Sequence, residues 1–352
     1  MHLYPLFFPI FVKTIKMINA VRNTVLAVLN KNNYGYISPQ DFNLYAKQAQ
    51  MEIFEEYFSS YNKSINAENA RMSGTDYADI RKTMAEVMEG FLMKNNLPNV
   101  GFPYANNFTI PSLATTGDEA YMINTIITYP VILSTGTNTA VTPPFFQTLI
   151  DTLADFDQEG VKVGDIVVNL SQPASPANNQ TTTVASITNA STLVLAQPLF
   201  ATIGDSYAIF SAASGVEADK VLESKIFMLN RSNLTTPSNI FPSYVLNNQN
   251  GNSNIPVITM YPQTINTYGQ VVCTYFRYPK DPKWTYITLF NGEPSFDQSQ
   301  PDYQDFELPL EDEFKLAMKI LQYCGVSIRE IEVAQFGIGQ EQHEQPTFSQ
   351  QQ

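Results

Sequence analysis

The chain of 352 residues has few of the side chains on which enzyme chemistry usually depends. It contains two histidines, His2 and His343, and two cysteines, Cys273 and Cys324. Both histidines lie in terminal segments that are not expected to form a fixed pocket, which argues against Ser/His/Asp and Cys/His catalysis. The chain has neither the CxxC pair nor the histidine pair that is typical of a zinc site. We therefore expect no enzyme, and no catalytic, cofactor-binding or metal-binding residue.

Basic residues and phosphate-binding motifs are also scarce. The 20 Lys and Arg face 33 Asp and Glu, which gives a net charge of −13 and argues against holding a nucleic-acid backbone. The Gly337-Ile338-Gly339 pair lacks the third glycine and the strand-to-helix context of a nucleotide loop, and there is no Walker sequence. DNA is therefore not expected to bind specifically.

No apolar run is long enough to cross a membrane. The opening stretch His2–Val12 is apolar, but it is short, contains two prolines and has no basic residue before it. The following residues offer no small-residue cleavage site for a signal peptidase. We expect residues 1–16 to be an extension ahead of the true start or a partner-binding arm, and we expect no membrane association.

Charged residues make up only 15% of the chain, so its surface must rely on Asn, Gln, Ser and Thr. Such a surface is common in proteins that pack against copies of themselves or partners. Acids also cluster without an intervening base between Glu293 and Glu313. A solvated loop with an acid-rich helix start explains this best, and an acidic channel for DNA is the alternative.

The stretch Asn30–Phe42, NKNNYGYISPQDF, resembles a calcium loop at first sight. Gly35 and Ile37 fall at the right EF-hand positions, but Asp41 would be the only anionic ligand. Ser38 is instead a good N-cap, Pro39 suits the first helical position, and Asp41 follows the cap by three residues. The stretch predicts the corner of a helical hairpin, with a calcium sensor as a remote alternative.

Helical periodicity dominates both ends of the chain. Apolar residues recur at helical spacing in three early segments and one late segment. The early sets are Ile18, Val21, Val25, Val28 and Leu29; Phe42, Ala46, Ala49, Ile53, Tyr57 and Tyr61; and Tyr77, Ile80, Met84, Val87, Met88 and Phe91. Ser73 or Thr75 would cap the third helix and Asn95–Pro98 would end it. Pro309 opens the late helix, with Phe314, Ala317, Met318, Leu321 and Cys324 on one face and Gly325 at its end.

Strand patterns fill the middle of the chain. Residues 121–134 and three segments between 255 and 290 favour strands, whereas 145–156 favours a short helix and 217–230 is weakly helical. Residues 160–210 predict four or five short strands, two of them entered by the Gly-Asp turns Gly164-Asp165 and Gly204-Asp205. This spacing suits a small inserted barrel or sandwich.

The predicted fold is α+β: a helical bundle of N-terminal and C-terminal helices, with a central antiparallel β region that contains a small inserted β-barrel or sandwich. The expected divisions are an extension (1–16), a helical bundle (17–98), a β connection (99–156), an inserted β-domain (157–215), a mixed β region (216–306), C-terminal helices (307–338) and a flexible tail (339–352).

Aromatic residues between Tyr275 and Tyr286 offer the one further site hypothesis. The stretch YFRYPKDPKWTY contains Trp284 and could stack sugars. We favour a hairpin with alternate aromatics buried and with Pro279 and Pro282 in the turn. A carboxylate pair for glycoside hydrolysis carries no weight, because 33 acids always provide one somewhere.

Residues 30–58, with the pattern NKNxxGYIxPxDFNxYAxQAQxEIFEEYF, resemble the opening of neck or tail ring proteins of crAss-like podoviruses. The GVKVGDIVVN…IGDSYAIF unit looks like the small β-domains of phage structural proteins, and ELPLEDEFKLAMKILQYCG resembles a helix of portal adaptors and tail tubular proteins.

The resemblance implies a non-enzymatic virion subunit, repeated around the portal, commonly twelvefold, as a ring of the head-tail connector. Its partners would be copies of itself, the portal and other tail proteins, with DNA passing through the lumen during ejection. Its location would be the virion, after synthesis in the bacterial host cytoplasm. The alternative is a glycan-binding or glycan-degrading tail component.

Overall fold

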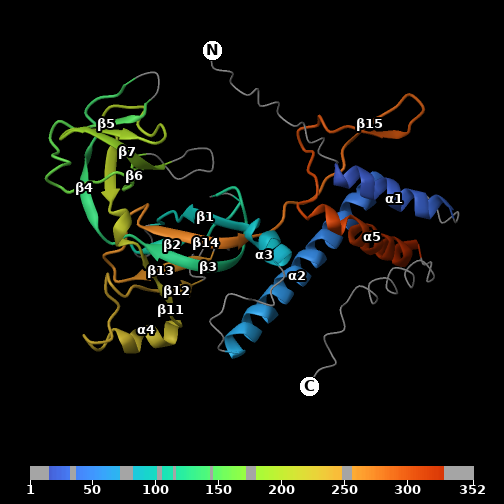
Figure 1. Cartoon of the computed structure of the whole chain (residues 1–352), viewed down its shortest axis with the longest axis horizontal. Coiled ribbons are helices and arrows are strands. Elements are labelled where there is room, and N and C mark those ends of the chain that lie inside the picture. Colours follow the sequence, from blue (N-terminus) through green and yellow to red (C-terminus); the bar gives the residue numbers. More distant parts are fainter. Residues whose placement is uncertain are drawn as a thin grey trace, which may run out of the picture. The chain divides into compact units, whose positions relative to one another are not determined.

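A computed structural model describes residues 16–31, 37–71, 82–100, 105–113, 116–142, 146–171, 180–247 and 256–328. The fold is mixed α+β, as predicted (Figure 1). The chain divides into two compact units. The helical unit comprises Met1–Gly90 and Pro279–Gln352, and the β unit comprises Phe91–Tyr278.

The helical unit combines segments from both ends of the sequence. Its α-helices are α1 (Met17–Lys31), α2 (Pro39–Arg71), α3 (Lys82–Glu89) and α5 (Glu313–Ile328), the last preceded by the 3-10 turn η2 (Leu310–Asp312). A hairpin of β15 (Tyr286–Thr288) and β16 (Pro294–Phe296) precedes η2 and α5 in the C-terminal part of this unit. The predicted first two helices are confirmed, because their apolar faces are buried.

The core of the helical unit is not made by helices alone. It includes Ile18, Val21, Val25 and Leu29 of α1, Phe42, Ala46, Ala49 and Ile53 of α2, and Leu316, Ala317, Ile320, Leu321 and Cys324 of α5. Trp284, Phe306 and Leu308 from the irregular segment before α5 complete it. The predicted helical bundle is therefore not confirmed as such, because non-helical residues supply part of the core.

Two helix starts are fixed by side-chain caps. The Asp41 amide donates to Ser38 Oγ at 3.1 Å, and Ser38 Oγ donates to Asp41 Oδ2 at 2.6 Å, so the predicted cap of α2 is confirmed. The start of α1 is capped from far along the chain: the amides of Met17 and Ile18 donate to the Asp305 carboxylate at 3.2 and 2.8 Å. Such capping satisfies helix amides that have no partner within the helix.

Some predictions for the two ends of the chain were wrong, and others fall outside the described residues. The third helix ends at Glu89, and Leu92–Asn96 forms strand β1, because these residues pair with β14. Gly325 lies inside α5, which continues to Ile328, and Phe314 is half exposed rather than buried. The caps proposed at Ser73 and Thr75, residues 1–15 of the predicted extension, the part of the predicted C-terminal helices beyond Ile328, and the tail from 339 lie outside the described residues.

Two four-stranded sheets form a sandwich in the β unit. One has the order β1-β14-β3-β10, and the other β11-β12-β13-β2. Their bounds are β1 Leu92–Asn96, β2 Asn107–Thr109, β3 Ala120–Thr128, β10 Val216–Glu217, β11 Asp219–Lys220, β12 Ser243–Asn247, β13 Val257–Tyr261 and β14 Val271–Arg277. Side chains from both sheets share one core, among them Phe108, Ile126, Ile258, Cys273 and Tyr275.

The third sheet of the β unit is a curled, half-barrel sheet of six antiparallel strands with the order β4-β9-β6-β7-β8-β5. The strands are β4 Ile132–Thr137, β5 Thr148–Ile150, β6 Ile166–Asn169, β7 Thr181–Asn189, β8 Thr192–Leu195 and β9 Ser206–Phe210. The two edges approach each other through a bridge between Ala140 and Ile150. The sheet thus starts well before residue 157, where the sequence predicts the small β-domain to begin.

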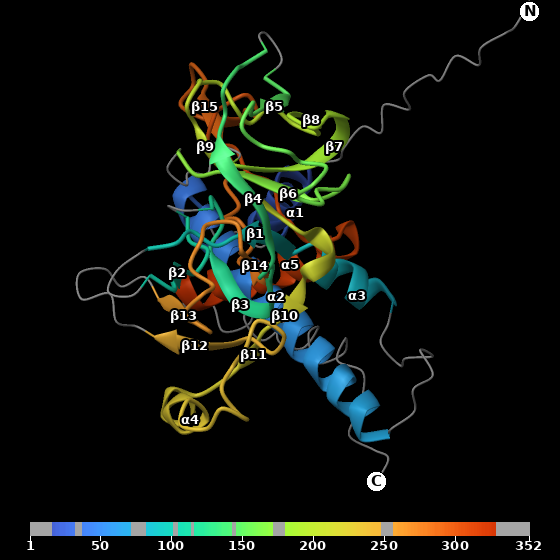
Figure 2. The ribbon, with the colours of Figure 1, turned by 90° about the vertical axis from the view of Figure 1, so that its left-hand side faces the viewer.

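Figure 2 shows the six-stranded sheet at one end of the β unit and α4 (Glu223–Leu229) at the other, with the sandwich between them. Val168, Ala208 and Phe210 of the curled sheet share a core with Tyr129 and Val272 of the sandwich segments. This core makes the three sheets one unit.

Two local predictions in this region were wrong. Within the segment 145–156, which the sequence predicts as a helix, the described residues 146–156 form strand β5 and turns, because Thr148–Ile150 pair with Thr192–Val194. The aromatic stretch from Tyr275 is not a hairpin. Tyr275 lies in β14 between β1 and β3, whereas Tyr286 pairs with Phe296 in the helical unit.

Candidate functional site

The side chains considered for chemistry from the sequence are not assembled into a site. His2 and His343 lie outside the described residues. Cys273 is buried in the β unit and Cys324 in the helical unit, and both are free. Burial raises the pKa of each thiol to about 12, so neither is a thiolate at neutral pH.

Within the described part of the chain, no group of three or more His, Cys, Asp or Glu side chains could hold a metal ion. The calcium-loop candidate is partly outside this part, but Asp41 is described. Its carboxylate accepts from the Ser38 hydroxyl, so this group serves the start of α2.

The acidic run after Glu293 is used for local structure. Asp305 caps α1, Asp302 pairs with Lys283 at 2.5 Å, and the Lys280 amide donates to Glu307 at 2.7 Å. Hydrogen bonds from Ser299 and Gln300 lower the pKa of Asp297, and the hydrogen bond from Lys283 lowers that of Asp302. These contacts support the simpler explanation of the run, a solvated loop followed by an acid-rich helix start.

The two Gly-Asp turns are structural too. Gly164 and Gly204 have positive φ values of 96° and 92°, which glycine adopts without strain. The buried Asp165 accepts from the amides of Lys162 and Ala212 at 2.7 and 3.0 Å. Asp205 accepts from Asn169 Nδ2 at 3.1 Å. Each turn therefore leads into a strand through a hydrogen-bonded carboxylate.

Trp284 is a buried anchor and not a sugar platform. Its side chain is 2% exposed, and its Nε1 donates to Asn19 Oδ1 at 3.1 Å. Its backbone amide donates to Asn43 Oδ1 at 2.8 Å, and the Arg22 guanidinium lies 3.8 Å from the ring centroid. A sugar cannot reach the face of a ring that is covered in this way.

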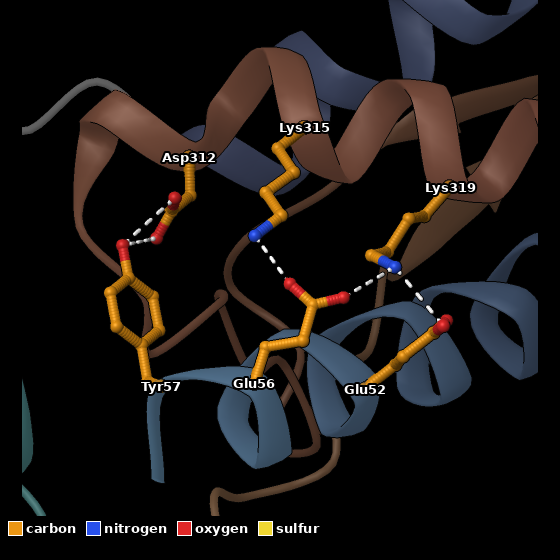
Figure 3. A network of polar contacts seen from close by, with 6 residues as sticks. All are labelled: Glu52, Glu56, Tyr57, Asp312, Lys315 and Lys319. Atoms are coloured by element: carbon orange, nitrogen blue, oxygen red, sulfur yellow. Dashed lines mark hydrogen bonds and ion pairs between the residues drawn. The ribbon is translucent and has the colours of Figure 1, made fainter. Parts of the chain in front are cut away.

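A polar network of side chains joins α2 to α5 and to the 3-10 turn before it (Figure 3). Lys319 pairs with Glu52 at 3.1 Å and with Glu56 at 2.9 Å, and Lys315 pairs with Glu56 at 2.5 Å. Both pairs of like residues are four positions apart, so each pair lies on one face of its helix. The two carboxylates and two ammonium groups balance in charge.

Hydroxyl groups extend the network at both ends. The Tyr57 hydroxyl donates to the Asp312 carboxylate at 2.9 and 3.0 Å, and the Tyr323 hydroxyl donates to Glu52 at 2.7 Å. Burial and the Asp312 carboxylate raise the pKa of Tyr57. The phenol thus stays protonated, and the arrangement serves to hold helices together.

Replacing Lys319 by methionine is expected to destabilise the helical unit by roughly 2 kcal/mol, because both ion pairs of a buried ammonium are lost. Urea unfolding followed by the fluorescence of Trp284, the single tryptophan, measures this. Lys47→Met is the matched control. Lys47 pairs with Asp281 at 2.6 Å on the surface, so its loss should cost about 0.5 kcal/mol or less. Equal effects of the two variants would contradict the structural role of the network.

Lys319→Met should also change how the free energy of unfolding depends on pH. Burial alone would raise the pKa of Glu56, but the Lys315 and Lys319 hydrogen bonds and charges outweigh it and lower the pKa below its usual 4.5. A lowered folded-state pKa contributes stability above about pH 4.5 that is lost as pH falls through the folded-state value. We expect this acid-dependent loss to shrink in Lys319→Met, as measured by unfolding between neutral pH and pH ~3.

Large apolar side chains are exposed on one excursion of the β unit, residues 222–241, here called the α4 segment. Ile226 is the buried residue of α4. Six large apolar side chains are between 62% and 94% exposed: Leu222, Phe227, Met228, Leu234, Ile240 and Phe241. Single exposed apolar residues are ordinary, but six large ones within 20 residues are an unusual concentration.

The hairpin of β15 and β16 carries a second exposed apolar group, and Figure 1 shows it projecting beyond α1. Its base is held by Tyr286 and Phe296, which stack on Trp284 with centroids 5.6 and 6.0 Å away. Its tip, residues 287–293, exposes Ile287, Leu289 and a fully exposed Phe290. The hairpin thus combines a packed aromatic base with an exposed apolar tip.

No protein-family model matches the chain, and the search of curated proteins found no relative. In the described residues, no helix is both long and apolar enough to span a membrane. The candidate functional features are therefore those the structure itself provides, the α4 segment and the hairpin tip.

Sequence reasoning missed both features. The sequence of residues 217–230 predicts only a weak helix. It does not show that Ile226 packs inward while Phe227 and Met228 stay exposed. The polar network had a visible signal, since Glu52/Glu56 and Lys315/Lys319 share the spacing of one helical turn.

Proposed function

We propose that this protein is a structural subunit of a phage particle, a ring of the portal-to-tail connector that forms part of the DNA ejection channel. The observation that carries a role in assembly is the exposure of apolar side chains on the α4 segment and the hairpin tip. These surfaces would be buried by neighbouring subunits. The assignment to a crAss-like podovirus rests on the resemblance of residues 30–58.

In this proposal, α1, α2 and α5 act as the bundle of the ring subunit, and the six-stranded sheet is its inserted small β-domain. Copies of the chain, the portal and other tail proteins are the partners, and the virion is the location. The net charge of −13, repeated around a ring, would keep DNA from adhering to the channel. The glycan-binding alternative loses its main motive, because Trp284 is buried.

Native mass spectrometry and negative-stain electron microscopy of the purified protein test the proposal. We expect ring-shaped oligomers of defined copy number, and we expect the chain among the proteins of purified particles. A strictly monomeric chain that is absent from the particle would overturn the proposal. Turnover of a substrate by the purified chain would also count against it.

A further inference from the structure

We propose that copies of this chain associate head to tail, with the hairpin tip of one copy docked on the α4 segment of the next. This inference rests on the proposed function, since it names the partner as a second copy. It goes further by assigning the two surfaces that meet.

The α4 segment is preformed for docking. Its ends are joined where Asp219 pairs with Ser243 and where the Val221 amide donates to Tyr244 O at 2.9 Å. The last turn of α4 is held by the Thr235 hydroxyl, which donates to Leu229 O at 2.9 Å. An apolar surface on a fixed backbone loses little entropy on binding.

The hairpin tip has the features expected of the element that docks on the α4 segment. The Leu289 amide donates to Glu293 O at 2.9 Å, and Gly292 closes the turn with a φ of 83°. Phe290 at this turn is fully exposed. Aromatic side chains held on a rigid turn are common anchors at interfaces, because they bury a large apolar area at a low entropy cost.

Charge favours the pairing of these two surfaces. The α4 segment carries Glu223 against Lys225 and Arg231, hence −1 + 2 = +1, in a chain whose net charge is −13. The hairpin of β15 and β16, residues 286–296, carries Glu293 and no base, hence −1. The α4 segment is thus locally basic, and the hairpin carries a negative charge.

A symmetric pairing of α4 with α4 explains less. It would bring Lys225 and Arg231 toward the same residues of the other copy and leave Phe290 uncovered. A hairpin-to-α4 contact covers both apolar groups. Because the two surfaces differ and lie in different units of every copy, the contact is heterologous, and its repetition generates a closed ring when the rotation between copies closes.

Two substitutions test the contact against a matched control. Phe290→Ser on the hairpin and Phe241→Ser on the α4 segment should each raise the concentration at half-assembly by about tenfold or more. Leu153→Ser is the control, since Leu153 is 90% exposed on a turn of the six-stranded sheet and lies outside both surfaces. Circular dichroism verifies that each variant is folded. Assembly that is unchanged in both variants, or weakened equally in the control, would overturn the proposal.

Cross-linking identifies the surfaces directly. Thr288→Cys and Ser224→Cys place thiols on the exposed hairpin and at the exposed start of α4, while Cys273 and Cys324 are buried and unreactive. With a short bis-maleimide, we expect cross-linked dimers when the two variants are mixed, and none with either variant alone.

The outcomes separate this inference from the proposed function. Cross-links in Ser224→Cys alone would show that α4 faces α4 and would overturn the inference. Rings without any cross-link would also overturn it, yet leave the ring function standing. A cross-link found only within a single doubly substituted chain would show that the hairpin docks on its own copy. A chain that forms no oligomer would end both proposals.

Discussion

Replacing Trp284 by alanine is expected to destabilise the helical unit by about 4 kcal/mol, the usual cost of removing a fully buried large aromatic side chain. The loss is more than one of volume. Asn19 loses its hydrogen-bond donor, the Arg22 guanidinium loses the ring beneath it, and Tyr286 and Phe296 lose the surface on which they stack. The helices and the base of the hairpin should loosen together.

Urea unfolding followed by circular dichroism at the helix band measures this effect, because the fluorescent probe is itself removed. Trp284→Phe is the control: it keeps an aromatic ring in the core but removes the Nε1 donor to Asn19. Its expected cost is about 1–2 kcal/mol. A Trp284→Ala variant no less stable than Trp284→Phe would show that the core does not depend on this ring.

Replacing Gly269 by alanine should destabilise the β unit by roughly 3 kcal/mol or more. Gly269 has a φ of 86°, where an alanine is strained, and an added Cβ would lie 2.4 Å from Val168 Cγ2. Val168 belongs to the core that joins the six-stranded sheet to the sandwich. We therefore expect faster hydrogen exchange in peptides that cover β6, β9 and β14.

Gly204→Ala isolates the collision from the backbone strain. Gly204 lies in the same unit with a similar φ of 92°, but an added Cβ there would meet nothing within 4 Å. Its cost should be limited to about 1–2 kcal/mol of left-handed strain. If the two variants were equally stable, the contact between Gly269 and Val168 would not be a point of close packing.

The sequence predicted correctly those elements whose conformation is determined by residues close together in the chain. The apolar faces of α1 and α2, the Ser38-Asp41 cap and the Gly-Asp turns of the six-stranded sheet all follow from residues a few positions apart. Each of these predictions is confirmed.

The errors arose where distant pairing decides the conformation. Leu92–Asn96 continues a helical pattern, yet it forms a strand because Val272–Phe276, far along the sequence, offers it an edge. Thr148–Ile150 likewise takes its conformation from β8. Tertiary pairing overrides local preference at such positions.

The candidate interaction surfaces could not be predicted for a similar reason. A sequence shows that Phe227, Met228 and Phe290 are apolar, but only the packing shows that they face outward. Which apolar residues remain exposed, and are therefore available to other subunits, does not follow from the periodicity of the sequence alone.

The chain enters the β unit through β1 and leaves it through β14, and these two strands are paired. Leu92 pairs with Phe276, and the Arg277 amide donates to Phe91 O at 3.0 Å. During translation, the strands of this unit can therefore pair before α5 has been synthesised. By contrast, α1 and α2 are synthesised first, but their apolar faces are buried only after Trp284 and α5 have been synthesised. The cap of α1 likewise requires Asp305. A nascent chain that stops short of α5 would thus carry a finished β unit beside two uncovered helices, an obvious client for chaperones.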